Sequence, residues 1–204
     1  MTIDAHGYFD FALLEPGPPG KQYPERNAME GMALHSAEGW YAGSLSELRR
    51  ADRQASWCMF LRMDGSLVQH YPVWASCWAS GNARANTTLV SLELEGLAGT
   101  PINAAQTKTL RRVADELGQY AGWWPSRTVP GRTLWEHREV WDWGTPNAGP
   151  TACPSGRYAP FYAALAGAPG KPQEEGTPMT PDERQRLENI EALLGGRENV
   201  AMQV

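Results

Sequence analysis

The sequence lacks several features that define large classes of protein. None of its apolar runs, in a chain of 204 residues, approaches the ~20 residues of a membrane-spanning helix, so no membrane insertion is expected. Its three cysteines are an odd number and imply no complete disulfide framework. Lysine is scarce, with three residues against 15 arginines, and the net charge is −5. This acidic balance argues against a nucleic-acid-binding protein.

The start of the chain also lacks a signal. Residues 1–6 contain no basic start and no apolar segment, so we expect synthesis in the cytoplasm without a signal peptide. A protein that acts outside that cell would then need another route of release. What the chain does have is an apolar content of 42%, enough for a packed core, and 21 glycines with 16 prolines, which favour many loops.

Strand and helix patterns alternate along the chain. An Asp64-Gly65 turn between two apolar runs predicts a β-hairpin, and residues 89–95 alternate between apolar and polar side chains. The expected strands are Glu30–His35, Ser56–Met63, Ser66–Tyr71, Leu89–Glu95 and Thr133–Val140, and the expected helices are Ser44–Gln54, Asn103–Tyr120, Arg157–Leu165 and 181–195. This order predicts an α/β fold, a central mixed β-sheet flanked by helices, with a short C-terminal helix.

Composition divides the chain into four parts. Residues 1–28 read as an irregular N-terminal arm, 29–165 as the folded domain, 166–180 as a Pro/Gly-rich linker, and 181–204 as a C-terminal helix and tail. Leucine and isoleucine form one narrow stripe on the last helix. We expect this stripe to form a homo-oligomer through residues 181–195, or to pack on the chain's own domain.

Three residues could form a metal site. His35 ends one predicted strand, His137 lies toward the end of another, and Cys153 follows His137 by 16 residues. Two imidazoles and one thiolate suit zinc, and a fourth position left open for water is typical of a catalytic site. The alternative is that both histidines are hydrogen-bonded structural residues and that the thiol is merely buried.

A wider pattern connects these residues. The chain contains LHS at 34–36, WCMFLRMDGSLVQHYP at 57–72, CWASGNARANTTLVSLELEG at 77–96, WEHREV at 135–140 and TACP at 151–154. In this order and spacing, the segments resemble the zinc-dependent N-acetylmuramoyl-L-alanine amidases of type 2. That family includes phage lysozyme-type amidases and peptidoglycan recognition proteins. The resemblance covers about residues 29–165, which it identifies as a zinc amidase catalytic domain.

The resemblance implies a role for each matching residue. His35, His137 and Cys153 match the family's zinc ligands, Glu93 matches its catalytic carboxylate, and Thr151 matches a position that helps to hold the oxyanion. The alternation of the 89–95 strand agrees, because it places Glu93 on the polar face. Glu95 shares that face, and we interpret it as a supporting or solvent-facing residue.

Aromatic and amide side chains near these positions are candidates for substrate binding. Trp57, Trp78 and Asn86 are assigned this role, because tryptophan rings can stack on sugars and asparagine can bind amides. The alternatives are core packing for the tryptophans and turn capping for Asn86. Cys58 and Cys77 are expected to be buried, although a disulfide between them is the alternative.

The implied function is zinc-dependent hydrolysis of the amide bond between N-acetylmuramic acid and L-alanine in peptidoglycan. The chain would then be a phage endolysin, made in the host cytoplasm and acting on the cell wall after release. Two alternatives are a non-catalytic peptidoglycan-binding module and a zinc peptidase that cuts within stem peptides. The presence of both Cys153 and Glu93 favours an enzyme over a binding module.

Overall fold

The computed structural model describes residues 2–143 and 149–167. Met1–Gly167 forms one compact unit. The helix expected at 181–195, with its proposed self-association, lies outside the described residues, as does most of the expected linker. Within the described ranges, no helix is both long enough and apolar enough to cross a membrane.

A six-stranded mixed sheet forms the centre of the unit, as the sequence predicts. Its spatial order is β1-β5-β4-β7-β3-β8, formed by Leu13–Leu14 (β1), Met59–Leu61 (β4), Leu67–Gln69 (β5), Gly31–Ser36 (β3), Leu89–Leu94 (β7) and Leu134–Glu136 (β8). The β4–β5 pair is the predicted hairpin and is antiparallel, whereas the other neighbouring pairs are parallel. The C-terminal ends of β3, β7 and β8 therefore meet at one edge.

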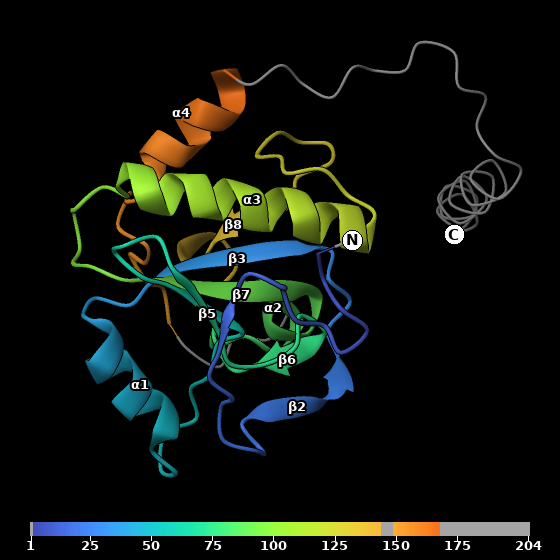
Figure 1. Ribbon diagram of the computed structural model, residues 1–204, viewed down its shortest axis with the longest axis vertical. Coiled ribbons are helices and arrows are strands. Elements are labelled where there is room, and N and C mark those ends of the chain that lie inside the picture. Colours follow the sequence, from blue (N-terminus) through green and yellow to red (C-terminus); the bar gives the residue numbers. More distant parts are fainter. Residues whose placement is uncertain (1, 144–148, 168–204) are drawn as a thin grey trace, which may run out of the picture. The chain divides into compact units, whose positions relative to one another are not determined.

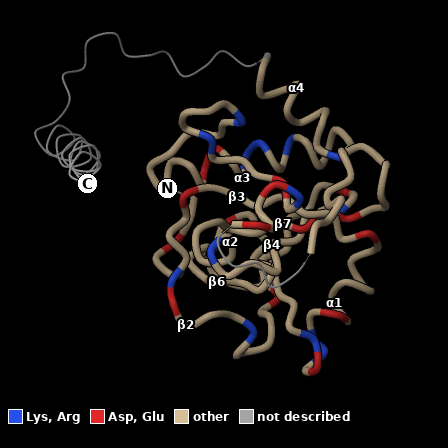
Figure 2. The backbone as a smooth tube through the Cα atoms, turned by 180° about the vertical axis from the view of Figure 1, so that it is seen from behind, with Lys and Arg blue, Asp and Glu red and all other residues tan. Residues whose placement is uncertain are grey.

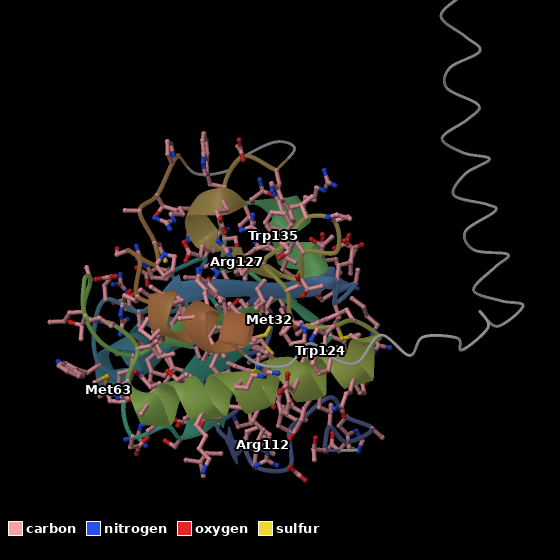
Figure 3. The ribbon with its side chains drawn as sticks, turned by 90° about the horizontal axis from the view of Figure 1, so that it is seen from above. Met32, Met63, Arg112, Trp124, Arg127 and Trp135 are labelled. Carbon is pink, nitrogen blue, oxygen red and sulfur yellow. The ribbon has the colours of Figure 1, made fainter. Side chains whose placement is uncertain are left out.

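Side-chain alternation gives the sheet two different faces. Met32 and Leu34 of β3 are fully buried together with Leu92 of β7, which is the register partner of Leu34. Figure 1 shows α3 and α4 over one face of the sheet, and α1, α2 and the small β2–β6 sheet over the other. In Figure 3, Met32 lies among the side chains of the α3 and α4 side. The alternate residues, which include His35 and Glu93, therefore face the opposite side.

The helices are α1 (Tyr41–Arg49), α2 (Ala83–Thr88), α3 (Ala104–Ala121) and α4 (Ala159–Gly167). The prediction for α3 is confirmed, and its capping box is formed by Asn103 and Gln106. The prediction for α1 is wrong at both ends, because the helix begins at Tyr41 and ends at Arg49. The Glu95 carboxylate accepts a hydrogen bond from the Tyr41 amide at 2.6 Å, so a distant residue replaces the expected Ser44 cap.

The prediction of an irregular arm is also wrong. Within 1–28, β1 pairs with β5, and β2 (Gln22–Arg26) pairs antiparallel with β6 (Ala75–Cys77). Phe9 is buried in the core, and the guanidinium of Arg112 on α3 lies over the Phe11 ring, 3.7 Å from its centroid. Figure 3 labels Arg112. The arm is held by partners far away in the sequence, so its local pattern gives little sign of these strands.

Candidate active site

The three predicted metal ligands come together at one edge of the sheet. His35 lies near the end of β3, His137 follows β8 directly, and Cys153 belongs to the loop before α4. One ligand atom from each residue lies within 4.8 Å of the other two. The expected strand 133–140 is shorter than predicted, because a 3₁₀ turn, His137–Glu139, replaces its second half. This turn directs His137 away from the strand and toward His35.

A single turn contacts both imidazoles. His137 Nε2 lies 3.1 Å from the Ser80 carbonyl oxygen, and His35 Nε2 lies 3.4 Å from the Ser80 hydroxyl. These contacts leave Nδ1 of each ring available as a metal ligand. Asn86 holds the turn in place, because its Oδ1 accepts hydrogen bonds from the amides of Ala79 (3.2 Å) and Ser80 (2.8 Å).

Hydrogen bonds from backbone amides and from a buried tyrosine hydroxyl position the remaining groups of the cluster. The Ser36 amide donates to the Cys153 thiol at 3.2 Å, and the Arg138 amide donates to the Cys153 carbonyl at 2.8 Å. The Tyr158 hydroxyl donates to the carbonyl of His35 at 2.8 Å. These bonds tie the Cys153 loop and α4 to the ends of β3 and β8.

Glu93 lies beside this cluster. It is the register partner of His35, and its Oε1 is 3.9 Å from His35 Nδ1. The side chain is 13% exposed, and Oε2 is enclosed without a hydrogen-bond partner in the described part of the chain. Burial raises the pKa of Glu93 to about 8, with a further contribution from Glu38. A cation held by the neighbouring donors would favour the carboxylate form of Glu93, which is the form that can accept a proton.

The protonation states of the cluster depend on its burial. Burial and the neighbouring His137 lower the pKa of His35 well below its ordinary value, and burial also lowers the pKa of His137. Both rings are therefore neutral, as metal ligands must be. Burial, followed by the charge of Glu93, raises the pKa of Cys153 to about 12. A cation among the three donors would favour the thiolate form.

Glu95 is a supporting residue and not a solvent-facing one. It is 7% exposed, and its two carboxylate oxygens accept the amides of Tyr41 and Met63, each at 2.6 Å. The carboxylate therefore joins the start of α1 to the hairpin turn. Both oxygens of Glu95 therefore hold backbone amides, and Glu95 does not line the cleft that contains Glu93.

Arg157 is a residue of the site whose role the sequence does not reveal. It is 1% exposed, and its guanidinium donates to the Ser36 hydroxyl at 2.7 Å and to the Leu94 carbonyl at 2.9 Å. It also donates to the carbonyls of Glu95 and Thr100. The only signal in the sequence is its position four residues after Cys153. This buried positive charge lies behind the strand ends that carry His35 and Glu93.

A network of charges supports the turn that carries His137. The Glu139 carboxylate accepts the Glu136 amide at 2.7 Å and pairs with Arg127 and Arg132. Burial works to raise the pKa of Glu139, but the hydrogen bonds from the two arginines lower it to about 2. Glu139 is therefore ionised over the usual pH range, and its ion pairs with the two arginines persist.

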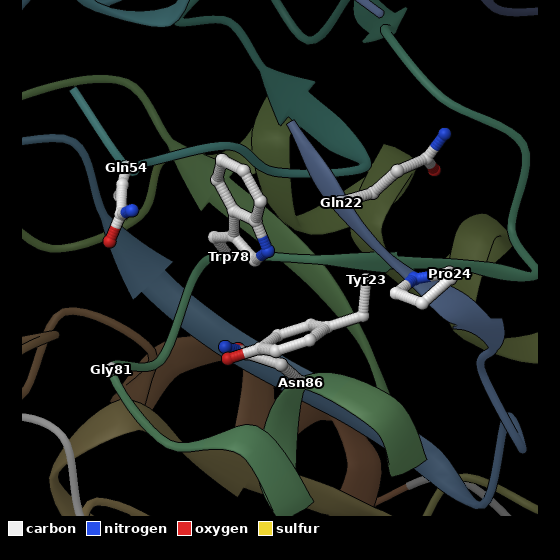
Figure 4. A pocket seen from close by; sticks show the side chains of 7 residues that line it. All are labelled: Gln22, Tyr23, Pro24, Gln54, Trp78, Gly81 and Asn86. Atoms are coloured by element: carbon white, nitrogen blue, oxygen red, sulfur yellow. The ribbon is translucent and has the colours of Figure 1, made fainter. Parts of the chain in front are cut away.

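Two hollows adjoin the cluster. The first, which we call the Glu93 cleft, has a volume of about 430 Å³ and is lined by residues 36–40, Gly43, Ser44, Glu47, Arg53, Ala55, Trp57 and Glu93. The second, which we call the Trp78 pocket, has a volume of about 410 Å³ and is lined by Gln22, Tyr23, Pro24, Gln54, Trp78, Gly81 and Asn86 (Figure 4).

The predicted substrate-binding residues divide between these hollows. Trp57 lines the Glu93 cleft, whereas Trp78 and Asn86 line the Trp78 pocket. Asn86 uses its side-chain oxygen for the turn, which was the alternative role considered for it. Thr151 is half-buried, and its hydroxyl oxygen accepts the Cys153 amide at 3.1 Å. Cys58 and Cys77 are buried free thiols, as expected, and not a disulfide.

Metal-binding side chains clustered beside a buried carboxylate are typical of hydrolases that use a metal ion. The profile of the N-acetylmuramoyl-L-alanine amidase family matches residues 25–156. The chain therefore belongs to this family, and it is an enzyme that hydrolyses an amide bond of peptidoglycan. A search of curated proteins finds no match.

Several solved structures share the fold. The structure of PlyL is 15% identical, covering 76% of this chain and 96% of its own, with a TM-score of 0.56. The endolysin amidase LysCS from Clostridium intestinale is 13% identical, covering 78% and 98%, with a TM-score of 0.54. The hydrolase AmiA of Staphylococcus aureus, solved in complex with its ligand, is 20% identical, covering 69% and 73%, with a TM-score of 0.51.

Proposed function

We propose that the chain is a zinc-dependent amidase that cleaves the bond between N-acetylmuramic acid and L-alanine, and that His35, His137 and Cys153 hold the zinc. The observation that carries the proposal is the approach of three donor atoms to within 4.8 Å, with the Glu93 carboxylate 3.9 Å from one of them. Residues 29–165 would form the catalytic domain, to which the arm adds part of the Trp78 pocket.

The donor set fits zinc. Two imidazole nitrogens and one sulfur are borderline to soft ligands, and three protein ligands are typical of catalytic zinc sites. The Nε2 atom of each histidine is occupied by Ser80, so each ring has one nitrogen left for a metal. The enclosed Glu93 oxygen without a partner supports a site that receives a further polar group.

The chain's own residues supply the proton transfers. Glu93 would accept a proton from the attacking water and then deliver it to the leaving nitrogen of L-alanine. When bound, zinc would polarise the scissile carbonyl and lower the pKa of a coordinated water. The Thr151 oxygen accepts the Cys153 amide, so the hydroxyl proton remains free to be donated to the developing oxyanion.

The Glu93 cleft is the proposed position of the stem peptide. Four of its lining residues are ionisable, namely Glu38, Glu47, Arg53 and Glu93, and Trp57 forms part of its wall. A peptide presents charged groups and backbone amides, which suit a lining of this kind. Acidic and basic residues occur together along α1 and the segment that follows it (Figure 2). Charges of both signs are therefore available to bind the peptide.

A lytic role on the cell wall is the proposed biological setting. The support is the two endolysins among the similar structures, and this role agrees with the phage origin expected from the sequence. An enzyme that recycles wall fragments would use the same chemistry. The two roles differ in substrate, because a lytic enzyme must cleave intact, cross-linked peptidoglycan.

Product analysis tests the proposed reaction. Purified peptidoglycan is digested with and without a chelator, and the released ends are identified by mass spectrometry. We expect free L-alanine amino ends and intact N-acetylmuramic acid, with loss of release after chelation and recovery when zinc is added. New ends within the stem peptide would identify a peptidase and contradict the proposal.

A further inference from the structure

Arg157 is the one arginine in the described part of the chain that is fully buried, with 1% of its surface exposed. Its guanidinium makes four hydrogen bonds there, and every acceptor is neutral: the Ser36 hydroxyl and the carbonyls of Leu94, Glu95 and Thr100. A buried charge destabilises a protein unless its surroundings are closely fitted to it. A guanidinium that is held in this way beside the metal cluster therefore calls for a specific role.

The surroundings of this side chain fit a guanidinium and not merely a positive charge. The Nε atom and both Nη atoms donate, and their acceptors lie at the ends of β3 and β7 and in the loop after β7. The single nitrogen of a lysine side chain cannot reproduce this fork. Gly96 provides the space, because a Cβ atom there would collide with Arg157 Nη2, and its φ of +121° favours glycine. The position is therefore specific for arginine.

One residue, Ser36, connects Arg157 to the thiol of the metal cluster. The Ser36 hydroxyl oxygen accepts from Arg157 Nη1 at 2.7 Å, and the Ser36 backbone amide donates to the Cys153 thiol at 3.2 Å. The backbone closes the circuit, because the Arg157 amide donates to the carbonyl of Pro154, the residue after Cys153, at 3.2 Å. The loop that carries Cys153 is thus anchored, through Arg157, on the strand ends that carry the other groups of the site.

The charge and the hydrogen bonds of Arg157 act on a bound metal in opposite directions. A guanidinium repels a cation held by neighbouring donors, so its charge alone would weaken metal binding. Its hydrogen bonds fix the loop that carries a metal ligand, so they would strengthen metal binding. Removal of the side chain therefore has a diagnostic sign. Metal affinity rises or stays constant if Arg157 is only a buried structural cation, and it falls if the hydrogen bonds position the ligand.

We propose that Arg157 is a positioning residue of the metal site, which acts through Ser36 to hold the Cys153 thiol toward His35 and His137. This inference rests on the proposed function, because it takes these three donors as the metal ligands. Arg157 itself touches neither the metal donors of the histidines nor the substrate. Its effect on the reaction is therefore indirect and begins with the binding of the metal.

Zinc affinity, measured by competitive titration of the metal-free full chain without substrate, tests the proposal. Arg157→Met should lower the affinity about 10- to 100-fold, as is typical when a residue that supports a metal ligand is lost. Arg157→Lys keeps the charge but not the fork, so it should restore only part of the affinity. Bound Co²⁺ gives a second readout, because absorption from the sulfur–cobalt bond should weaken in the same order.

Changes at Ser36 test the connection without removing the buried charge. Ser36→Ala removes one acceptor of the guanidinium and should lower zinc affinity about 2- to 10-fold, the value of a single hydrogen bond. Ser36→Thr keeps a hydroxyl at the same position and should retain most of the affinity. A role for Arg157 in stability alone would not distinguish these two variants in a zinc titration.

Lys21 provides a matched control for the loss of a buried cation. It is 5% exposed, and its Nζ donates to the Leu48 carbonyl at 2.6 Å. It belongs neither to the metal cluster nor to the lining of either hollow. Lys21→Met should therefore lower thermal stability and leave zinc affinity at the wild-type value. This control separates a general loss of stability from a loss of ligand position.

The possible outcomes are distinct. The inference is overturned if Arg157→Met binds zinc as tightly as wild type or more tightly, or if Lys21→Met loses as much affinity as Arg157→Met. If Arg157→Met does not fold, Ser36→Ala decides, and an affinity equal to that of wild type overturns the inference. Failure of the wild-type protein to bind zinc would instead overturn the proposed function, whereas tight binding that no variant weakens would overturn only the role of Arg157.

Discussion

The Glu93 cleft and the Trp78 pocket have similar volumes, about 430 and 410 Å³, but opposite chemistry. The cleft has four ionisable residues in its lining, and burial raises the pKa of one of them, Glu93, to about 8. The pocket has only neutral groups. Of the two linings, only the one on the cleft side of the 53–57 segment, which contributes to both hollows, therefore contains a group suited to proton transfer. The other lining can contact a ligand only through neutral groups.

The two hollows also differ in how their residues are brought together. The cleft is formed by the end of β3, by α1 and by β7, all within the part of the chain that matches the family. The pocket includes Gln22 and Tyr23 of β2, and the family match begins only at residue 25. The Glu93 cleft thus lies within the matched segment, while the Trp78 pocket also includes two residues of β2 that precede it.

The largest expected effect comes from a change in the metal cluster, which lies next to both hollows. Cys153→Ser replaces the thiolate ligand, so we expect loss of bound zinc and of activity on every substrate, as with a chelator. Metal content by elemental analysis and peptidoglycan release would be measured together. Cys58→Ser is the matched control, because Cys58 is a buried thiol outside the cluster. Full activity of metal-free wild-type protein would contradict the zinc assignment.

The next largest effect is expected from Glu93, in the charged lining of the Glu93 cleft. Glu93→Gln keeps the shape of the side chain but cannot accept a proton, so kcat should fall about 10²- to 10⁴-fold while zinc content stays near wild type. Glu95→Gln is the comparison on the same strand face. It should lower thermal stability more than kcat, because Glu95 holds the amides of Tyr41 and Met63. A near-normal rate in Glu93→Gln would remove Glu93 from the mechanism.

A third, smaller effect is expected at Asn86, which lines the Trp78 pocket and also holds the turn that contacts both histidines of the metal cluster. Asn86→Ala removes the acceptor for the Ala79 and Ser80 amides and loosens the turn that contacts both histidines. Loss of such a supporting contact typically lowers metal affinity about 10- to 100-fold. Asn86→Asp keeps the acceptor oxygen and should retain most of the affinity in a competitive zinc titration. Equal affinity in wild type and Asn86→Ala would show that the turn does not position the ligands.

Local patterns explain which parts of this site are predictable from sequence. The alternation in Leu89–Glu95 places Glu93 on the polar face, and the apolar runs that end at His35 and near His137 place both histidines at one sheet edge. The Asn103 cap and the Asp64-Gly65 turn are equally local signals. Each depends on residues that are neighbours in the chain, so the sequence alone contains the relevant information.

The remaining features depend on distant partners. The β2–β6 pair joins two short segments about 50 residues apart in sequence, and neither has a clear alternating pattern. Ser80 contacts His137 through a backbone carbonyl, which every residue possesses. The start of α1 is fixed by Glu95, and Arg157 donates to backbone carbonyls of another element. Such contacts leave no motif, because almost any sequence could supply the acceptor.

The smallest expected effect is a difference between Arg53 and Gln54, two adjacent residues that face opposite sides of the 53–57 segment. Arg53 pairs with Glu47 at 3.2 Å on the wall of the Glu93 cleft, and both side chains are about half exposed. Exposed pairs of this kind contribute about 0–1 kcal/mol, so Arg53→Gln should leave folding unchanged. A stem peptide carries carboxylates, so losing the guanidinium should raise KM about 2- to 5-fold at low ionic strength, an effect that salt screens. Gln54→Ala, on the neutral side, should raise KM by a factor that does not depend on salt. Steady-state kinetics of both variants at low and high ionic strength would test the contrast, and an equal salt dependence would mean that charge does not distinguish the two hollows.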